Sequence, residues 1–226
     1  MHEIKNFPQI RVAKFIKPIM VLASVILFLS FTLPQDKIMK NQSNEIIIDS
    51  NLNFKEAIAG LKFPDKVKQE LTLIKVNYFG FDGKLHQGEL VVNCAVSAEV
   101  KAIFKKLLSV QFPLEKVIPI SAYDWNDEKS MLDNNTSAFN YRVIKGTERL
   151  SKHSYGLAID INPFLNPYVK KKSVEPEGAI YNPKVKGTIT ANSDIVNIFK
   201  SYGWHWGGDW TKGKDYQHFE KVISQH

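Results

Sequence analysis

The 226-residue sequence contains a single cysteine, Cys94, which excludes an intrachain disulfide and a cysteine-rich zinc site. Cys94 lies in the apolar run 90–96, where a small buried strand residue is the ordinary interpretation and a reactive thiol is the alternative. The sequence also lacks internal repeats, low-complexity tracts and an arginine-rich stripe. With 44% hydrophobic residues, it can form one well-buried domain with some additional segments.

The positive charge is modest and unevenly distributed. The formal net charge is +7, of which residues 1–17 carry +3, leaving +4 for the other residues. Without a basic stripe, this remainder does not predict binding to nucleic acid. A mild positive charge suits an anionic polymer such as a cell wall, but charge alone does not identify such a partner.

Residues 19–33 contain no charged side chain and follow the basic segment 1–17. This layout is typical of a signal peptide or a signal-anchor. No Ala-x-Ala cleavage site follows, which favours an uncleaved anchor, although the run is shorter than the ~20 residues that usually span a bilayer. A buried core helix is the other interpretation, and the basic flank argues against it. In both membrane interpretations the rest of the chain is exported.

Composition and periodicity divide the sequence into an N-terminal signal segment (1–33), a polar linker (34–50) and one domain (51–226). Strand and helix patterns are mixed in the domain, without the regular alternation that a parallel sheet requires. The sequence therefore predicts an α+β domain. The expected elements are short helices within 54–71, a hairpin with strands at 71–78 and 88–93, helices at 96–110 and 194–202, strands at 139–144 and 156–161, and a long loop at 162–190.

His153 and Asp160 are the residues that point most directly to chemistry. They are seven positions apart, so on one straight strand their side chains would face opposite sides. A turn at 154–156, which ends on a glycine, would let both side chains reach one point. His218, from a separate segment, would then be a third ligand. Two imidazole nitrogens and a carboxylate oxygen suit a catalytic zinc ion, which takes three protein ligands and leaves one position for water.

Two further residues complete this candidate site. A zinc ion lowers the pKa of a bound water to ~7, and a nearby carboxylate must accept the proton and deliver it to the leaving amine. Asp215, three residues before His218, can lie on the same face of a turn, so we assign it as general base and acid. Arg142 is the candidate for stabilising the oxyanion. By spacing alone this pattern is a moderate signal, because chance pairings of histidine and aspartate are common.

Four separated motifs occur in order along the chain. They are Ser137-Ala-Phe-Asn-Tyr-Arg142, Ser151-Lys-His-Ser-Tyr-Gly-Leu-Ala-Ile-Asp-Ile-Asn-Pro163, Trp206-Gly-Gly-Asp-Trp210 and Asp215-Tyr-Gln-His-Phe-Glu220. Together they resemble the zinc peptidase family of VanY-like D,D-carboxypeptidases, D-Ala-D-Ala dipeptidases and phage endolysin L-alanyl-D-glutamate endopeptidases. The likeness covers roughly residues 70–222.

This resemblance implies one zinc ion, a general base and substrate-binding side chains at matching positions. The zinc ligands would be His153, Asp160 and His218, the base Asp215, and the substrate-contacting residues Arg142 and Ser151. It also implies a single catalytic domain of the Hedgehog/D,D-peptidase type, with a small antiparallel sheet and flanking helices. The dipeptidases carry glutamate where this chain has Asp215, so the pattern looks more like the endolysin branch.

The function implied is hydrolysis of peptide bonds in peptidoglycan stem peptides by a zinc metallopeptidase, with the L-Ala–D-Glu endopeptidase type favoured. The alternatives are a D-alanyl-D-alanine carboxypeptidase with the same site, a non-catalytic zinc-binding cell-wall module, and an exported protein in which these residues are structural. Retention of Asp215 favours an enzyme. We expect a monomer, membrane-anchored or secreted to the cell wall, whose partner is a peptidoglycan peptide.

Residues close to the motifs have two interpretations each. His205 could be a fourth ligand or a donor to a ligand, or it could only pack or line the groove. Asp209 could be a rival base or a structural carboxylate. Trp204, Trp206 and Trp210 could line a glycopeptide groove or pack in the core.

Overall fold

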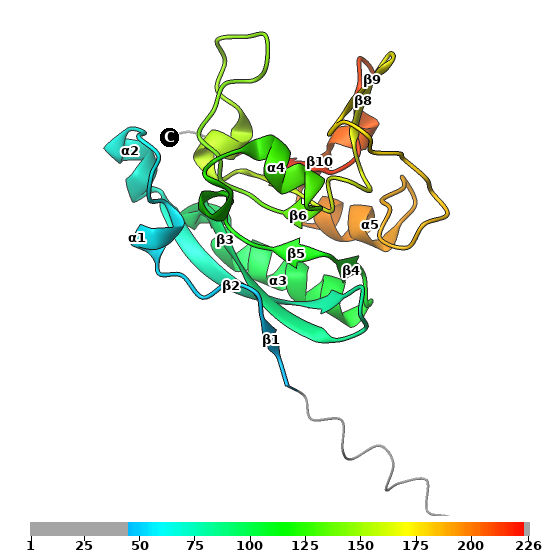
Figure 1. The fold of residues 1–226 in the computed structure, drawn as a ribbon, viewed down its shortest axis with the longest axis horizontal. Helices are drawn as coiled ribbons and strands as arrows, with labels where there is room; N and C mark the ends of the chain where they lie inside the picture. Colours follow the sequence, from blue (N-terminus) through cyan, green and yellow to red (C-terminus); the bar gives the residue numbers. More distant parts are fainter. Residues whose placement is uncertain (1–44, 224–226) are drawn as a thin grey trace, which may run out of the picture. The chain divides into compact units, whose positions relative to one another are not determined.

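The computed structural model describes residues 45–223. The predicted signal-anchor at 19–33 and most of the predicted linker lie outside these residues. Within 45–223, no helix combines the length and the apolar character needed to cross a membrane. These residues form a mixed domain of short helices and several small sheets (Figure 1), in agreement with the predicted α+β class.

The largest sheet is built on the predicted hairpin. β2 (Leu71–Gly80) and β3 (Leu85–Asn93) pair antiparallel, and the sheet has the order β1-β3-β2-β4. The two edge strands, β1 (Ile47–Ile48) and β4 (Pro113–Leu114), pair parallel with their neighbours. This sheet is therefore antiparallel at its centre, as predicted, and parallel at both edges.

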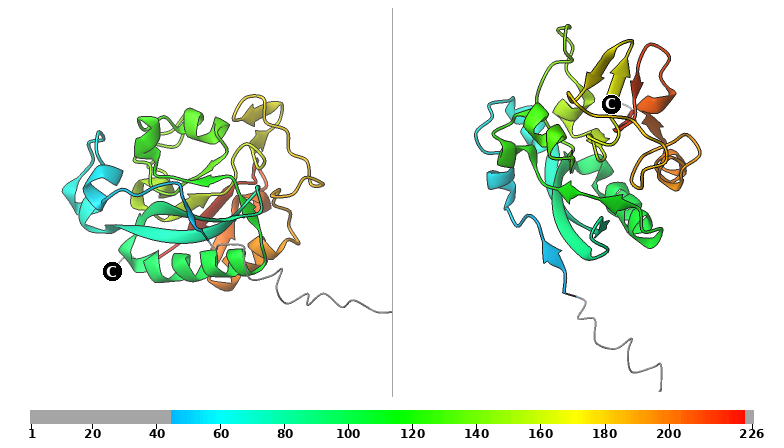
Figure 2. Two further views of the ribbon diagram at one scale, coloured as in Figure 1. Left: turned by 60° about the horizontal axis from the view of Figure 1, so that its bottom comes forward. Right: turned by 45° about the vertical axis from the view of Figure 1, so that its right-hand side comes forward.

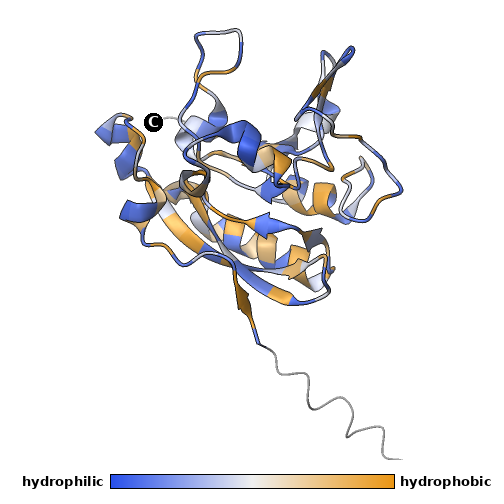
Figure 3. Ribbon diagram, viewed as in Figure 1, coloured by the Kyte–Doolittle hydropathy of each residue, from blue (hydrophilic) through white to orange (hydrophobic). Residues whose placement is uncertain are grey.

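One helix covers a face of this sheet. α3 (Ser97–Ser109) confirms the helix predicted at 96–110, and it runs along the sheet in Figure 2. Hydrophobic and hydrophilic residues are mixed along α3 and along the hairpin (Figure 3). α3 buries one side, whereas the second half of β3 is buried on both faces. The residues that α3 buries in the main core are Val100, Ile103, Phe104 and Leu107.

A second sheet joins the C-terminal part of the chain to this core. Its order is β10-β12-β7, with antiparallel pairs throughout. The strands are β10 (Trp204–Trp206), β12 (His218–Lys221) and β7 (Ala158–Asp160). α5 (Asp194–Ser201), predicted at 194–202, packs against it, and the rings of Phe199 and Phe219 stack with their centroids 3.9 Å apart. Both residues belong to the same buried cluster as the α3 side chains.

The remaining elements are short. They are α1 (Phe54–Ala57), α2 (Asp65–Gln69) and α4 (Asp127–Leu132), the parallel pair β5 (Lys116–Val117) and β6 (Asn135–Thr136), and the antiparallel sheet of β11 (Lys214–Asp215), β8 (Tyr168–Lys170) and β9 (Ser173–Glu175). The hairpin β8–β9 lies inside the segment 162–190, which the sequence predicts as a loop. Strands of two or three residues are too short to show a periodic pattern.

Two local predictions are wrong. No strand forms over 139–144. Instead, the Ser154 hydroxyl donates a hydrogen bond to the Arg142 carbonyl and accepts one from the Arg142 amide, so the backbone at Arg142 is bonded to the turn that contains Ser154. Cys94 is exposed rather than buried in a strand. The Asn93 side chain accepts from the Ala95 amide and starts a short 3-10 helix, Cys94–Val96, which ends β3 one residue before the cysteine.

Candidate metal centre

The first half of the site is a tight turn followed by a strand. His153 lies in the 3-10 helix Lys152–Tyr155, whose amide at His153 is capped by the Ser151 hydroxyl. Gly156 ends this helix in the left-handed conformation, with φ of +63°, and the chain then enters β7. A Cβ at Gly156 would lie 2.5 Å from the Asn93 amide nitrogen, so glycine is required here for conformation and for space. The predicted turn between His153 and Asp160 is thus present.

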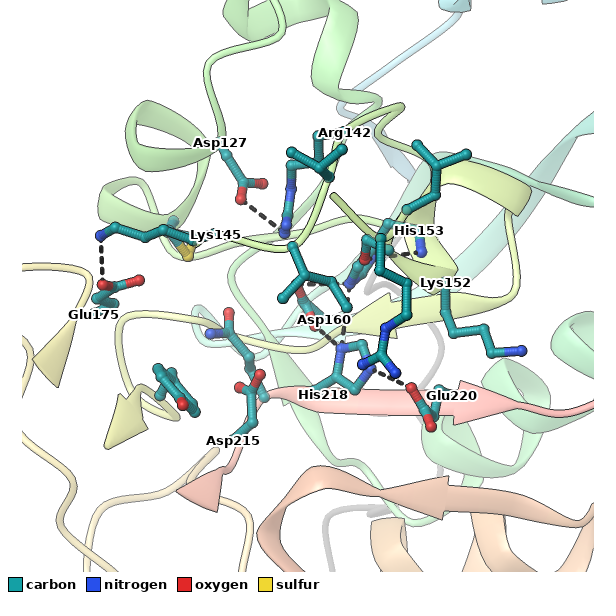
Figure 4. A pocket seen from close by; sticks show the side chains of 18 of the residues that line it. Asp127, Arg142, Lys145, Lys152, His153, Asp160, Glu175, Asp215, His218 and Glu220 are labelled. Atoms are coloured by element: carbon teal, nitrogen blue, oxygen red, sulfur yellow. Dashed lines mark hydrogen bonds and ion pairs between the residues drawn. The ribbon is translucent and has the colours of Figure 1, made fainter. Parts of the chain in front are cut away.

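The pairing of β7 with β12 supplies the second half. In this register Asp160 lies directly opposite His218. The His218 Nδ1 is 3.0 Å from Asp160 Oδ1 and 3.2 Å from His153 Nε2, and His153 Nε2 is 3.1 Å from Asp160 Oδ2. All three residues are buried, with exposures of 3%, 7% and 6% for His153, Asp160 and His218. Figure 4 shows the three side chains converging.

This donor set fits a zinc ion. Four ligands at zinc–ligand distances of about 2.1 Å in a tetrahedron are separated from each other by about 3.4 Å, close to the separations of the three donor atoms here. One candidate ligand atom from each of the three residues lies within 4.8 Å of the other two. The outward Nδ1 of His153 bonds to the Ala138 carbonyl, which leaves its Nε2 free of hydrogen and able to bind a metal.

In the triad of His153, Asp160 and His218, opposite charges stabilise one another. Burial alone would raise the pKa of Asp160, but the two neighbouring imidazoles outweigh this effect and hold that pKa well below its usual range. Burial alone would lower the pKa of His218, but its hydrogen bonds to Asp160 and Glu220 outweigh it and raise the pKa to about 10. A metal that binds here must therefore displace a proton from His218, as is usual for histidine ligands.

Asp215 is a partly buried carboxylate in the same pocket, and its Oδ1 is shielded from solvent. It lies in β11 and points toward the triad in Figure 4. Its Oδ1 has no hydrogen-bond partner among residues 45–223. Burial raises its pKa to about 6, and the charge of Asp160 adds to this, while the two histidines oppose it. A carboxylate with this pKa can both accept and return a proton near neutral pH.

The pocket is a broad cavity of about 1210 Å³ over the triad. One wall is the segment 142–153 and another is the hairpin β8–β9, and an ion pair of 2.7 Å between Lys145 and Glu175 joins them. Arg142 lines this cavity, and its guanidinium forms an ion pair of 2.9 Å with Asp127 on α4. Ser151 also lines it, beside its role as the cap of His153.

Comparison with known proteins agrees with this geometry. Residues 145–221 match the family model described as D-alanyl-D-alanine carboxypeptidase. A curated relative, the peptidoglycan L-alanyl-D-glutamate endopeptidase CwlK of Bacillus subtilis (strain 168), is 37% identical over 75 residues. That match covers 32% of this chain and 40% of CwlK, so the chain spans less than half of the length of that relative. No solved structure matches the chain.

The segment matched by the family model, residues 145–221, contains most, but not all, of the predicted site. His153, Asp160, Asp215 and His218 lie inside 145–221, whereas Arg142 precedes it. The structure brings the three predicted ligands and Asp215 into one pocket, and it places Arg142 and Ser151 on the pocket wall.

The structure separates the residues that had two interpretations. His205 is exposed on β10 and is not part of the cluster of ligand atoms found among residues 45–223. Asp209 pairs with Lys200 at 2.7 Å on the surface, which favours the structural interpretation. Trp204 and Trp206 are buried, whereas Trp210 is 37% exposed, lines the pocket and has its ring centroid 5.3 Å from that of His218.

Two residues of the site were not predicted. Asp127 holds Arg142, and it also accepts a hydrogen bond from the Asn140 side chain, 3.2 Å away. Glu220 contacts the outer nitrogen of His218 at 3.2 Å. The position of Glu220, two residues after a ligand on a strand, could have indicated this contact. Nothing in the sequence links Asp127 to Arg142, because the contact is tertiary.

Proposed function

We propose that the chain is a zinc-dependent peptidase that hydrolyses peptide bonds in peptidoglycan stem peptides. The observation that carries the proposal is that three buried candidate ligands and a separate, partly buried carboxylate share one pocket, all four within the segment that matches the peptidase family model. When bound, zinc supplies Lewis acidity that polarises a carbonyl and lowers the pKa of water. The ligands for it are His153, Asp160 and His218.

In this proposal Asp215 moves the proton. Its carboxylate accepts a proton from the attacking water and delivers it to the nitrogen of the leaving amine. The Oδ1 of Asp215 has no hydrogen-bond partner among residues 45–223, and burial raises the pKa of the carboxyl to about 6, so it can take up a proton near neutral pH. Arg142, fixed by Asp127 on the pocket wall, binds an oxygen of the substrate.

The bond cleaved is proposed to be the one between L-Ala and D-Glu, supported by the 37% identity to an L-alanyl-D-glutamate endopeptidase. A D-alanyl-D-alanine carboxypeptidase is the second candidate, because the family description names that activity. We also propose that the domain acts outside the cytoplasm, held to the membrane or secreted, because an uncharged run at 19–33 follows a basic segment.

The test is to incubate the zinc-loaded chain with purified muropeptides that carry complete stem peptides and to identify the products by mass. We expect cleavage between L-Ala and D-Glu. Release of D-Ala alone would replace the endopeptidase assignment with the carboxypeptidase. A chain that holds zinc stoichiometrically but forms no product would point to a non-catalytic wall-binding module.

Two aspartate variants sharpen this experiment. Asp215→Ala is expected to keep zinc and to lose turnover by several orders of magnitude, because it removes the proton carrier but no ligand. Asp209→Ala is the matched control; it removes a surface carboxylate paired with Lys200 and should retain activity. Loss of zinc in Asp215→Ala would show that Asp215 is a ligand instead.

A further inference from the structure

Glu220 lies beside the metal centre without being one of the three ligands. It follows His218 by two positions on β12, so the two side chains project from the same face of the strand. The Glu220 Oε2 is 3.2 Å from His218 Nε2, and the Glu220 side chain is 25% exposed. Among residues 45–223, this is the one hydrogen bond that its carboxylate makes.

The orientation of His218 gives this contact its meaning. Its Nδ1 faces the donor atoms of His153 and Asp160, so Nε2 points away from them and toward Glu220. An imidazole that binds a metal through Nδ1 carries its hydrogen on Nε2. A carboxylate can only accept this hydrogen, so Glu220 selects the tautomer in which Nδ1 has a free lone pair.

His153 provides an internal comparison. Its outward nitrogen, Nδ1, also has an acceptor, but that acceptor is the neutral carbonyl of Ala138. The acceptor of His218 is a charged carboxylate, which forms a stronger hydrogen bond and makes the imidazole a better electron donor. Both histidine ligands therefore have a hydrogen-bond acceptor on the nitrogen that faces away from the other ligands, and the acceptor of His218 is the stronger one.

Glu220 lies on the middle strand of its sheet. Across the sheet it pairs in register with His205 of β10 on one side and Ala158 of β7 on the other. Figure 4 shows Glu220 directed at His218, at the edge of the pocket rather than inside the triad.

We propose that Glu220 is a positioning residue for the metal centre: its carboxylate accepts the Nε2 hydrogen of His218 and holds Nδ1 toward His153 and Asp160, which strengthens metal binding. The inference rests on the zinc site of the proposed function but not on the identity of the substrate. Carboxylates in this role contribute about 10- to 100-fold to metal affinity in other zinc proteins.

The test measures zinc affinity of the full chain by competition with a chromophoric chelator. Glu220→Ala is expected to weaken zinc binding by about 10- to 100-fold. Glu220→Gln keeps a neutral acceptor oxygen and should restore part of this loss. Glu70→Ala, an exposed glutamate after α2, is the control and should leave the affinity unchanged. An affinity of Glu220→Ala within twofold of the wild type overturns the proposal.

A second readout separates positioning from general stability. In the zinc-loaded wild type, the ¹⁵N resonances of His218 should show a metal-bound Nδ1 and a protonated Nε2, and Glu220→Ala should shift the Nε2 resonance. A His218 bound through Nε2 in the wild type would also overturn the proposal. If the wild type binds zinc tightly and cleaves no muropeptide, the proposed function fails while the role of Glu220 stands.

Discussion

The pocket contains two carboxylates whose environments push their pKa values in opposite directions. Two imidazoles hold the pKa of Asp160 far below its usual range, so it stays an anion, the form that a metal ligand requires. Burial raises the pKa of Asp215 to about 6, so it can exchange a proton near neutral pH. Such a divergence between neighbouring acids is what separates a charge-stabilising group from an acid–base group in enzyme sites.

The raised pKa of Asp215 predicts an acidic limb in the pH profile of kcat/KM. The base acts only when deprotonated, so activity should fall as pH falls through the pKa of Asp215. The limb should lie at or below pH 6, because a bound cation would lower the value of about 6 that burial and Asp160 produce. The measurement is kcat/KM at pH values from 4 to 8, in steps of ~0.5 pH unit. Metal analysis verifies the zinc occupancy at each pH.

Asp215→Glu is the control for this profile, since it keeps a carboxylate and should keep the limb at a changed rate. Asp215→Asn should leave only residual activity, and that activity should not show the limb. If the residual activity of Asp215→Asn falls with the same apparent pKa as the wild type, another group controls the profile.

At the scale of elements, the turn before β7 was predictable because its cause is local. Glycine adopts the left-handed backbone conformation of residue 156 without strain. The turn at this position brings His153 and Asp160 together. The irregular path of 139–144 was not predictable, because it depends on the Ser154 hydroxyl bonding the backbone of Arg142. The contact of Asp127 with Arg142 is likewise tertiary.

Gly156→Ala should damage both stability and metal binding. The left-handed conformation costs a side chain about 1 kcal/mol or more, and the new Cβ would lie 2.5 Å from the Asn93 amide and 2.8 Å from the Val92 carbonyl carbon. Relief of this clash must move the turn that carries His153. We expect a loss of roughly 2–4 kcal/mol in the free energy of unfolding, measured by urea denaturation, together with weaker zinc binding.

Gly146→Ala is the matched control. Gly146 also has a positive φ, +76°, but a Cβ there meets nothing within 4 Å. This variant should show the conformational cost alone, about 1 kcal/mol, with unchanged zinc affinity. Equal losses in the two variants would show that the close approach of Gly156 to β3 is unimportant.

At the scale of the molecule, the site depends on pairing between segments that are far apart in the sequence. His218 meets Asp160 only through the register of β12 with β7, and the neighbours of these residues on the two strands, Phe219 and Ile159, are core residues. The cluster of His153, Asp160 and His218 was predictable from motifs, as were α3, α5 and the β2–β3 hairpin. The short sheets around the site were not, because their strands follow from tertiary contacts and carry no periodic pattern of their own.

Because the ligands are buried among core residues and come from distant segments, zinc should bind the folded chain and not the unfolded one. At a free zinc concentration ~1,000 times the dissociation constant, this linkage adds about 4 kcal/mol of stability. For a domain of this size each kcal/mol raises the melting temperature by about 2–4 °C, so zinc should raise it by roughly 8–16 °C over the metal-free protein. Thermal unfolding with and without zinc, after treatment with a chelator, measures the shift. Asp215→Ala should keep the full shift, whereas His218→Ala should lose most of it; a shift that survives in His218→Ala would place the stabilising zinc at another site.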